Sequence, residues 1–491
     1  MQLPRTNRLW MLLALVALLA LLALAPPFYQ ANQELQAAET ALRSGAPAEA
    51  AQHLANAARR QPWRGDLWEQ AGHYAVQAGQ PDQAILYLEQ AGERLDGGLT
   101  RQGWLDLGDA RQQQGDTEAA VQAWEIVLSL GEAPTDVEVT SRLLQAHRAL
   151  GDYPAALRDA QALVNLQPGA AQWQFQLGML LAITPQPLSA LDPLRQAAEL
   201  DSGLAPVASR LEGDLLAASL VDDPAYQLLV AGRSLANLGE WGLAAEAFHQ
   251  AILAYPDYAE AWAYLGEARQ HLPVTPSGAT GAGAGLAELE KALALDQKSL
   301  AAHMFLALYW SRQGETTRAE QILRQAIELY PQQPILQVAL GDVLTSASEL
   351  DAAYEAYLAA VEMAPGEVVY LRRLASFSLS NGYLVEEVAL PVARQVVILA
   401  PRDAESLDLL AQVFLKLDDL DSARRFLEHA LLADPNYAPA YLHLGRLHLL
   451  RDEQSAAVQA FQKVYELAPG SPLAEQAQDW LKAYIGGGLT P

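Results

Sequence analysis

The sequence predicts an all-α fold, a solenoid of paired helices, because one pattern of about 34 residues returns along most of the chain. Each copy places small and apolar residues at helical spacing on two short segments, and many copies end at a proline. The last copy shows the pattern most plainly, with Tyr441, Leu444, Gly445, Ala457, Phe461, Val464 and Pro469. One pair of amphipathic helices cannot bury its apolar faces alone, so neighbouring copies must stack.

The first element is an apolar run, Leu9–Ala25, of 17 residues without a charge. At about 1.5 Å per residue, this run and its flanks are long enough to cross the hydrocarbon layer of a membrane. Arg5 and Arg8 precede the run, and almost nothing basic follows it closely. The positive-inside bias therefore makes residues 1–30 a cytoplasmic tip and a single transmembrane anchor, with the repeats outside the cytoplasm.

A cleaved secretion signal is the alternative interpretation of this run. Ala23, Leu24 and Ala25 resemble the site that a signal peptidase cuts. Pro26 and Pro27 follow directly and would hinder cleavage. The sequence favours an uncleaved anchor and leaves a secreted form as the alternative.

Twelve copies of the repeat follow, copies one to five in residues 31–204 and copies six to twelve in residues 225–471. Positions 8, 20 and 27 of a copy hold small residues, which let two helices approach closely, and bulky residues at positions 4 and 24 fill the space between them. Proline at position 32 ends the second helix, because it has no N–H for the hydrogen-bond ladder. Copy six illustrates the positions with Gly232, Ala244, Phe248, Ala251 and Pro256.

This pattern is similar to the tetratricopeptide repeat family. The resemblance covers most of the chain and implies a right-handed superhelical solenoid whose inner groove binds proteins or peptides. Three segments depart from the repeat. Residues 205–224 should hold an extra linking helix, residues 271–285 a mobile loop rich in Pro and Gly, and residues 472–491 a capping helix with a short tail.

Composition and motifs argue against catalysis and against nucleic acid. The chain has 58 acidic and 32 basic residues, a net charge of −26, which repels nucleic acid at long range. It has no cysteine, so thiolate zinc sites, disulfides and cysteine nucleophiles are excluded. No phosphate-binding loop, His-Glu-x-x-His or Gly-x-Ser-x-Gly occurs. We therefore expect no enzyme activity, no cofactor and no metal.

Three histidines near the C-terminus, His429, His443 and His448, are candidate metal ligands. The last two lie five residues apart on one predicted helix, and this spacing places them on different faces. Ordinary surface or groove histidines are therefore the favoured interpretation.

The groove itself should be lined by positions 2, 5, 9 and 12 of each first helix, which share one face and are here called the groove stripe. Relatives that grip a terminal carboxylate carry Lys and Asn on this stripe. Copies two and three of this chain instead have Asp66, Glu69, His73, Gln102, Leu105 and Asp109. The resemblance therefore does not extend to a carboxylate clamp.

Further along, the first helices offer large apolar groups and dispersed arginines, which suit an extended or helical peptide. The candidate groove residues are Phe175, Met179, Arg233, Met304, Arg372 and Arg446, and Leu308 stands beside Met304 on the same stripe. For each of them the alternative is packing against a neighbouring repeat.

The sequence thus predicts a membrane-anchored scaffold that binds protein or peptide partners and organises an envelope assembly, a secretion step or an export complex. The alternative is an accessory subunit that presents substrates to a glycosyltransferase or a protein-maturation enzyme. An enzyme in its own right is disfavoured, because the repeats occupy nearly all of the chain.

Overall fold

A computed structural model describes residues 28–130, 136–272 and 284–485, and every regular element in these ranges is a helix. The predicted all-α repeat fold is therefore confirmed for this part of the chain. Within the same ranges, no helix is both long and apolar enough to cross a bilayer. The predicted anchor and most of the predicted loop at 271–285 lie outside the described residues.

The chain divides into two compact units, Met1–Ala254 and Tyr255–Pro491. The described elements of the first unit are a helix that includes residues 28–43, α2 (Pro47–Arg60), α3 (Gly65–Gln77), α4 (Pro81–Gly92), α5 (Arg101–Gln114), α6 (Thr117–Ser129), α7 (Val137–Leu150), α8 (Tyr153–Leu166), α9 (Ala171–Ala182), the 3-10 helix η1 (Pro187–Ala190), α10 (Leu191–Leu200), α11 (Ala205–Ala218), α12 (Pro224–Asn237) and α13 (Trp241–Ala254).

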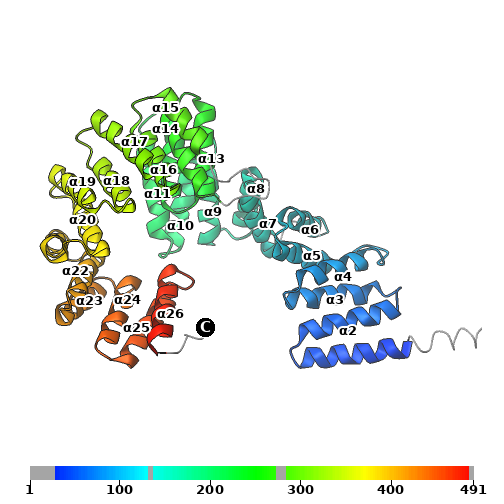
Figure 1. The fold of residues 1–491 in the computed structure, drawn as a ribbon. Coiled ribbons are helices and arrows are strands. Elements are labelled where there is room, and N and C mark those ends of the chain that lie inside the picture. The colour runs from blue at the N-terminus through cyan, green and yellow to red at the C-terminus, as the bar shows by residue number, and fades with distance from the viewer. Residues whose placement is uncertain (1–27, 131–135, 273–283, 486–491) are drawn as a thin grey trace, which may run out of the picture. The chain divides into compact units, whose positions relative to one another are not determined.

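The described elements of the second unit are α14 (Ala259–Gln270), α15 (Leu286–Leu295), α16 (Leu300–Arg312), α17 (Thr316–Leu329), α18 (Pro334–Ser346), α19 (Leu350–Met363), α20 (Val368–Asn381), the π-helical turn η2 (Val385–Ala389), α21 (Leu390–Leu399), α22 (Ala404–Lys416), α23 (Leu420–Ala433), α24 (Ala438–Leu450), α25 (Gln454–Leu467) and α26 (Pro472–Ile485). In each unit, consecutive helices pair and the pairs stack in chain order (Figure 1).

Contacts between positions 8 and 24 hold each pair together, as the repeat pattern predicts. A Cβ added to Gly232 on α12 would lie 2.4 Å from Cε1 of Phe248 on α13, and one on Gly445 would lie 2.5 Å from Cε1 of Phe461. Both phenylalanines are at most 1% exposed. The glycine is therefore required by the close approach of the two helices, because any larger residue would meet the ring.

Acidic residues begin many of the helices. Asp116, Asp136, Asp152, Asp403 and Asp419 each accept hydrogen bonds from backbone N–H groups in the first turn of the helix that follows. Such caps satisfy donors that have no partner inside the helix, and the helix dipole favours a negative charge there. Part of the acidic composition thus has a structural role at helix ends.

The linking segment contains α11, which packs against both α10 and α12 and so belongs to the first unit. Beyond α11 the chain turns back on itself. Arg148 on α7 donates to Glu240, in the turn between α12 and α13, with 2.6 Å between Nη2 and Oε2 and 92 residues between them in sequence. Accordingly α9 contacts α12 and α13 as well as α8, η1 and α10. A simple solenoid has contacts only between adjacent repeats, so this fold-back distinguishes copies four to six.

The last helix, α26, packs on α24 and α25. Its buried residues Ala477 and Leu481 join Phe461 and Val464 in one apolar cluster. Without this helix, the apolar face of the twelfth pair would be exposed to water.

Candidate peptide-binding groove

An apolar hollow of about 210 Å³ lies between the first helices α16 and α18 of the second unit. Its lining includes Met304, Leu308, Ile335 and Val338. These residues occupy positions 5 and 9 of copy eight and positions 2 and 5 of copy nine, so they belong to the groove stripe. Leu308 is 40% exposed and Ile335 is 38% exposed. The hollow therefore presents large apolar side chains to solvent on the face that the repeat pattern assigns to binding.

One carboxylate, that of Asp342 on α18, borders the hollow. Its Oδ2 accepts a hydrogen bond of 2.6 Å from Nη2 of Arg373, and its Oδ1 accepts one from the Tyr357 hydroxyl. Burial, and next the hydrogen bond to Asp342, raises the pKa of the Tyr357 hydroxyl. The carboxylate is thus already paired within the fold.

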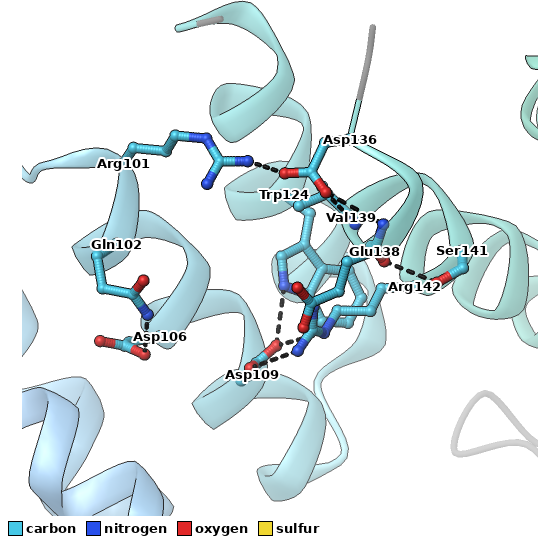
Figure 2. A network of polar contacts seen from close by, with 10 residues as sticks. All are labelled: Arg101, Gln102, Asp106, Asp109, Trp124, Asp136, Glu138, Val139, Ser141 and Arg142. Atoms are coloured by element: carbon cyan, nitrogen blue, oxygen red, sulfur yellow. Dashed lines mark hydrogen bonds and ion pairs between the residues drawn. The ribbon is translucent and has the colours of Figure 1, made fainter. Parts of the chain in front are cut away.

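A second hollow, of about 430 Å³, lies in the first unit between α5 and α7 and has more polar side chains in its lining. Asp109, Gln112, Gln113 and Gln145 line it, and they also stand on or next to the groove stripe. Figure 2 shows Asp109 accepting hydrogen bonds from Trp124 on α6 and Arg142 on α7. The amide side chains offer donors and acceptors of the kind that pair with a peptide backbone.

The Asp109 carboxylate experiences two opposed effects. Burial raises its pKa, while the Arg142 guanidinium, with Nε 3.1 Å from Oδ1, and the Trp124 Nε1–H, 3.2 Å away, act to lower it. Burial is the larger effect. Close by, Arg101 on α5 pairs with Asp136, the residue that caps α7 (Figure 2). Polar contacts of this kind fix the spacing between successive first helices.

The predicted groove residues in the first unit differ in accessibility. Phe175 on α9 is half-buried, but Met179, one turn further along the same helix, is 1% exposed. Arg233 on α12 is exposed. Met179 is therefore part of the core and not of a free surface, on a helix that α12 and α13 also contact.

In the second unit, Met304 lines the apolar hollow, whereas the two predicted arginines lie on other helices and have partners. Arg372 on α20 pairs with Glu405 and with Asp403, the capping residue of α22. Its side chain therefore links two successive first helices, as Arg101 does. The guanidinium of Arg446 lies 5.2 Å from the ring centroid of Trp480 on the capping helix. Of the three predicted residues in this unit, Met304 lines the hollow and the two arginines do not.

The residues of copy nine that complete the hollow, Ile335, Val338 and Asp342, were not singled out from the sequence. They occupy positions 2, 5 and 9 of the copy that starts at Pro334, and these positions could have identified them as members of the groove stripe.

The three candidate histidines contact carboxylates or an aromatic ring. His443 Nδ1 lies 2.7 Å from Asp408, His448 Nδ1 lies 2.5 Å from Glu453, and His429 packs edge-on against Phe426. In the described part of the chain, no group of three or more His, Asp or Glu residues could hold a metal ion.

Comparison with known families decides the identity of the repeat. The sequence model of the tetratricopeptide repeat matches residues 69–137, 141–205, 229–272, 281–334, 311–368 and 409–472, which together make up more than half of the chain. The chain belongs to the tetratricopeptide repeat family. None of the curated proteins compared matches it.

Several solved structures are similar to this chain. Yeast Tom70 is 16% identical with a TM-score of 0.43, and the match covers 86% of this chain and 96% of that one. A chain of the APC/C hetero-tetramer Cut9–Hcn1 is 13% identical with a TM-score of 0.39 over 93% and 98% of the two chains. YrrB, described as having an unusual peptide-binding site, is 19% identical with a TM-score of 0.29 over 39% and 97%. These similarities support no inference about function.

Proposed function

We propose that this tetratricopeptide repeat protein is a binding scaffold without catalytic activity, and that it holds an apolar peptide segment in the hollow between α16 and α18. The observation that carries the proposal is the exposure of Leu308 and Ile335 on the groove stripe. Binding sites for peptides are typically concave and apolar with a few polar groups at their border. The hollow has this composition, with Asp342 and Ser311 as its polar members.

Affinity in such a site should come from apolar anchors more than from charge. The one bordering carboxylate, Asp342, is paired with Arg373 and Tyr357. A partner cation would therefore compete with a bond that already exists, whereas an apolar side chain would cover Leu308 and Ile335, which now face water.

Truncating both anchors, Leu308→Ala with Ile335→Ala, should weaken peptide binding by at least tenfold and leave folding nearly unchanged. Anchors at the centre of an interface typically lose about 2 kcal/mol on truncation, while removal of side chains this exposed costs the fold little. The measurement uses a peptide selected against the full chain from a display library, with affinity followed by fluorescence polarisation and stability by thermal melting.

Leu432→Ala is the matched control, because Leu432 lies on a second helix, α23, and is 82% exposed. It should change neither affinity nor melting. If selected peptides bind the double variant as tightly as the parent, the hollow is not the binding site.

We further propose that residues 9–25 tether the scaffold to a membrane with the repeats outside the cytoplasm, where it organises an envelope assembly, a secretion step or an export complex. The support is the apolar run itself and the two arginines before it, Arg5 and Arg8.

Protease added to intact spheroplasts should digest the repeats, and the protein should remain in the membrane fraction until detergent is added. Complete protection of the repeats would show that the topology is inverted. A soluble mature form that begins at Pro26 would show instead that the segment is a cleaved signal.

A further inference from the structure

A separate cleft of about 450 Å³ lies between α2 and α4 in the first unit. Its lining includes Arg59, Trp68, Leu86, Tyr87 and Arg94. Apart from Trp68, these residues belong to the second helices of copies one and two or directly follow them. The groove stripe lies on the first helices, so this cleft is distinct from the proposed peptide site.

Positive charge is concentrated in the cleft, and the carboxylate that pairs with Arg94, that of Glu93, is not among the lining residues. The guanidinium carbons of Arg59 and Arg94 each lie 5.9 Å from the centroid of the Trp68 ring, and no lining residue is acidic. Arg59 donates to the neutral amide oxygen of Asn56, 2.8 Å away. Arg94 donates to a backbone carbonyl at 2.8 Å and contacts the largely exposed Glu93 only at 3.4 Å.

The indole nitrogen of Trp68 provides a second, independent observation. Trp68 is 6% exposed, and its Nε1–H is buried and has no hydrogen-bond acceptor. At the same position of other copies, Trp262 donates to the Pro256 carbonyl oxygen at 2.8 Å and Tyr441 donates to that of Pro435 at 3.1 Å.

Trp68 follows Pro62 by the same six residues, and Pro62 also lines the cleft, yet the equivalent bond is absent. Buried donors are rarely left unpaired in folded proteins. The side-chain donor at this position forms a hydrogen bond within the fold in copies seven and twelve, but in copy two it has no acceptor.

We propose that this cleft binds an organic oxyanion, a carboxylate or a phosphate ester joined to an apolar or aromatic group. Both guanidinium groups can donate two parallel hydrogen bonds to such an oxyanion. Leu86, which is 53% exposed, and Tyr87 supply an apolar wall beside the charge. The guanidinium groups of Arg59 and Arg94 and this wall together specify a ligand with a charged end and an apolar body.

The test is an NMR titration of the full chain carrying ¹⁵N-labelled tryptophan. The Trp68 indole N–H signal is identified by its loss in Trp68→Phe. Probes are 3-phenylpropionate and phenyl phosphate, with the uncharged 3-phenylpropanol as the control ligand. We expect a saturable shift of the Trp68 signal with at least one anion and none with the alcohol.

Arg94→Gln should weaken the anion by about tenfold or more, since it removes a charge-assisted hydrogen bond. Arg43→Gln is the matched control, because Arg43 lies in the same unit, is 84% exposed and is absent from the cleft. It should bind the anion as the parent does. The proposal is overturned if neither anion saturates the signal, if the alcohol shifts it equally, or if Arg94→Gln binds with unchanged affinity. None of these results bears on the peptide site in the second unit.

Discussion

Replacing Met179 by alanine should destabilise the first unit by about 2–5 kcal/mol, because the substitution removes a fully buried thioether side chain and leaves a cavity. Met179 is 1% exposed on α9, which is enclosed by α8, α10, α12 and α13. Because a repeat array does not unfold in one step, the loss of stability is best measured by hydrogen exchange in α9 and α12. The protection of backbone amides against exchange should fall in both helices.

Met304→Ala is the matched control for this prediction. The same side chain is removed, but Met304 is only half-buried and lines an open hollow. Water can replace part of the side-chain contacts that are lost. Met304→Ala should therefore lower the free energy of unfolding clearly less than Met179→Ala does. Equal costs for the two substitutions, or unchanged exchange in α9 after Met179→Ala, would contradict the placement of Met179 in the core.

The contrast between Met179 and Leu308 shows what the sequence can predict about the groove. Both residues occupy position 9 of a first helix, and the repeat pattern assigns both to the groove stripe. Leu308 is 40% exposed, while Met179 is buried. Helix α9 contacts α13 as well as its neighbours in the chain, and this additional contact accompanies the burial of Met179. Local periodicity contains no information about this contact, since its partners lie some 60 to 80 residues further along the chain.

The fold-back has its own chemical consequences. Burial, followed by the negative charge of Glu246 on α13, raises the pKa of Tyr153 on α8 to about 12. The hydroxyl oxygen of Tyr153 lies 2.7 Å from where a Cβ on Gly242 would stand. Helices from copies four and six are therefore in close contact, although a regular array would separate them by a whole repeat.

The helix pairs were predictable for a simpler physical reason. The close approach of two helices demands a small residue facing a large one, and this demand recurs at a fixed spacing in every copy. Polar contacts were less predictable. Arg372 has a spacing compatible with the groove, but its guanidinium is used by Asp403 and Glu405, 31 and 33 residues away. Which charges remain available depends on the neighbouring repeat and not on the copy itself.

Replacing Gly232 by valine should cost the first unit about 3 kcal/mol, the upper end of the range for overpacked cores. The first added carbon alone would lie 2.4 Å from Cε1 of Phe248, 2.7 Å from Cδ1 and 2.9 Å from Cζ. Phe248 is 1% exposed, so its ring is enclosed by neighbouring residues. The pair α12 and α13 must therefore separate, and contacts to α9 should weaken with it.

Gly213→Val is the control, because Gly213 is also helical, on α11, and a Cβ there would meet nothing within 4 Å. Valine favours a helix over glycine by a few tenths of a kcal/mol, so this variant should be as stable as the parent or slightly more so. Opposite signs for the two substitutions, measured by thermal melting and by hydrogen exchange in α13, would attribute the loss to the ring of Phe248 and not to the helix backbone. A melting temperature of Gly232→Val equal to that of Gly213→Val would show that the two helices do not approach as closely as described.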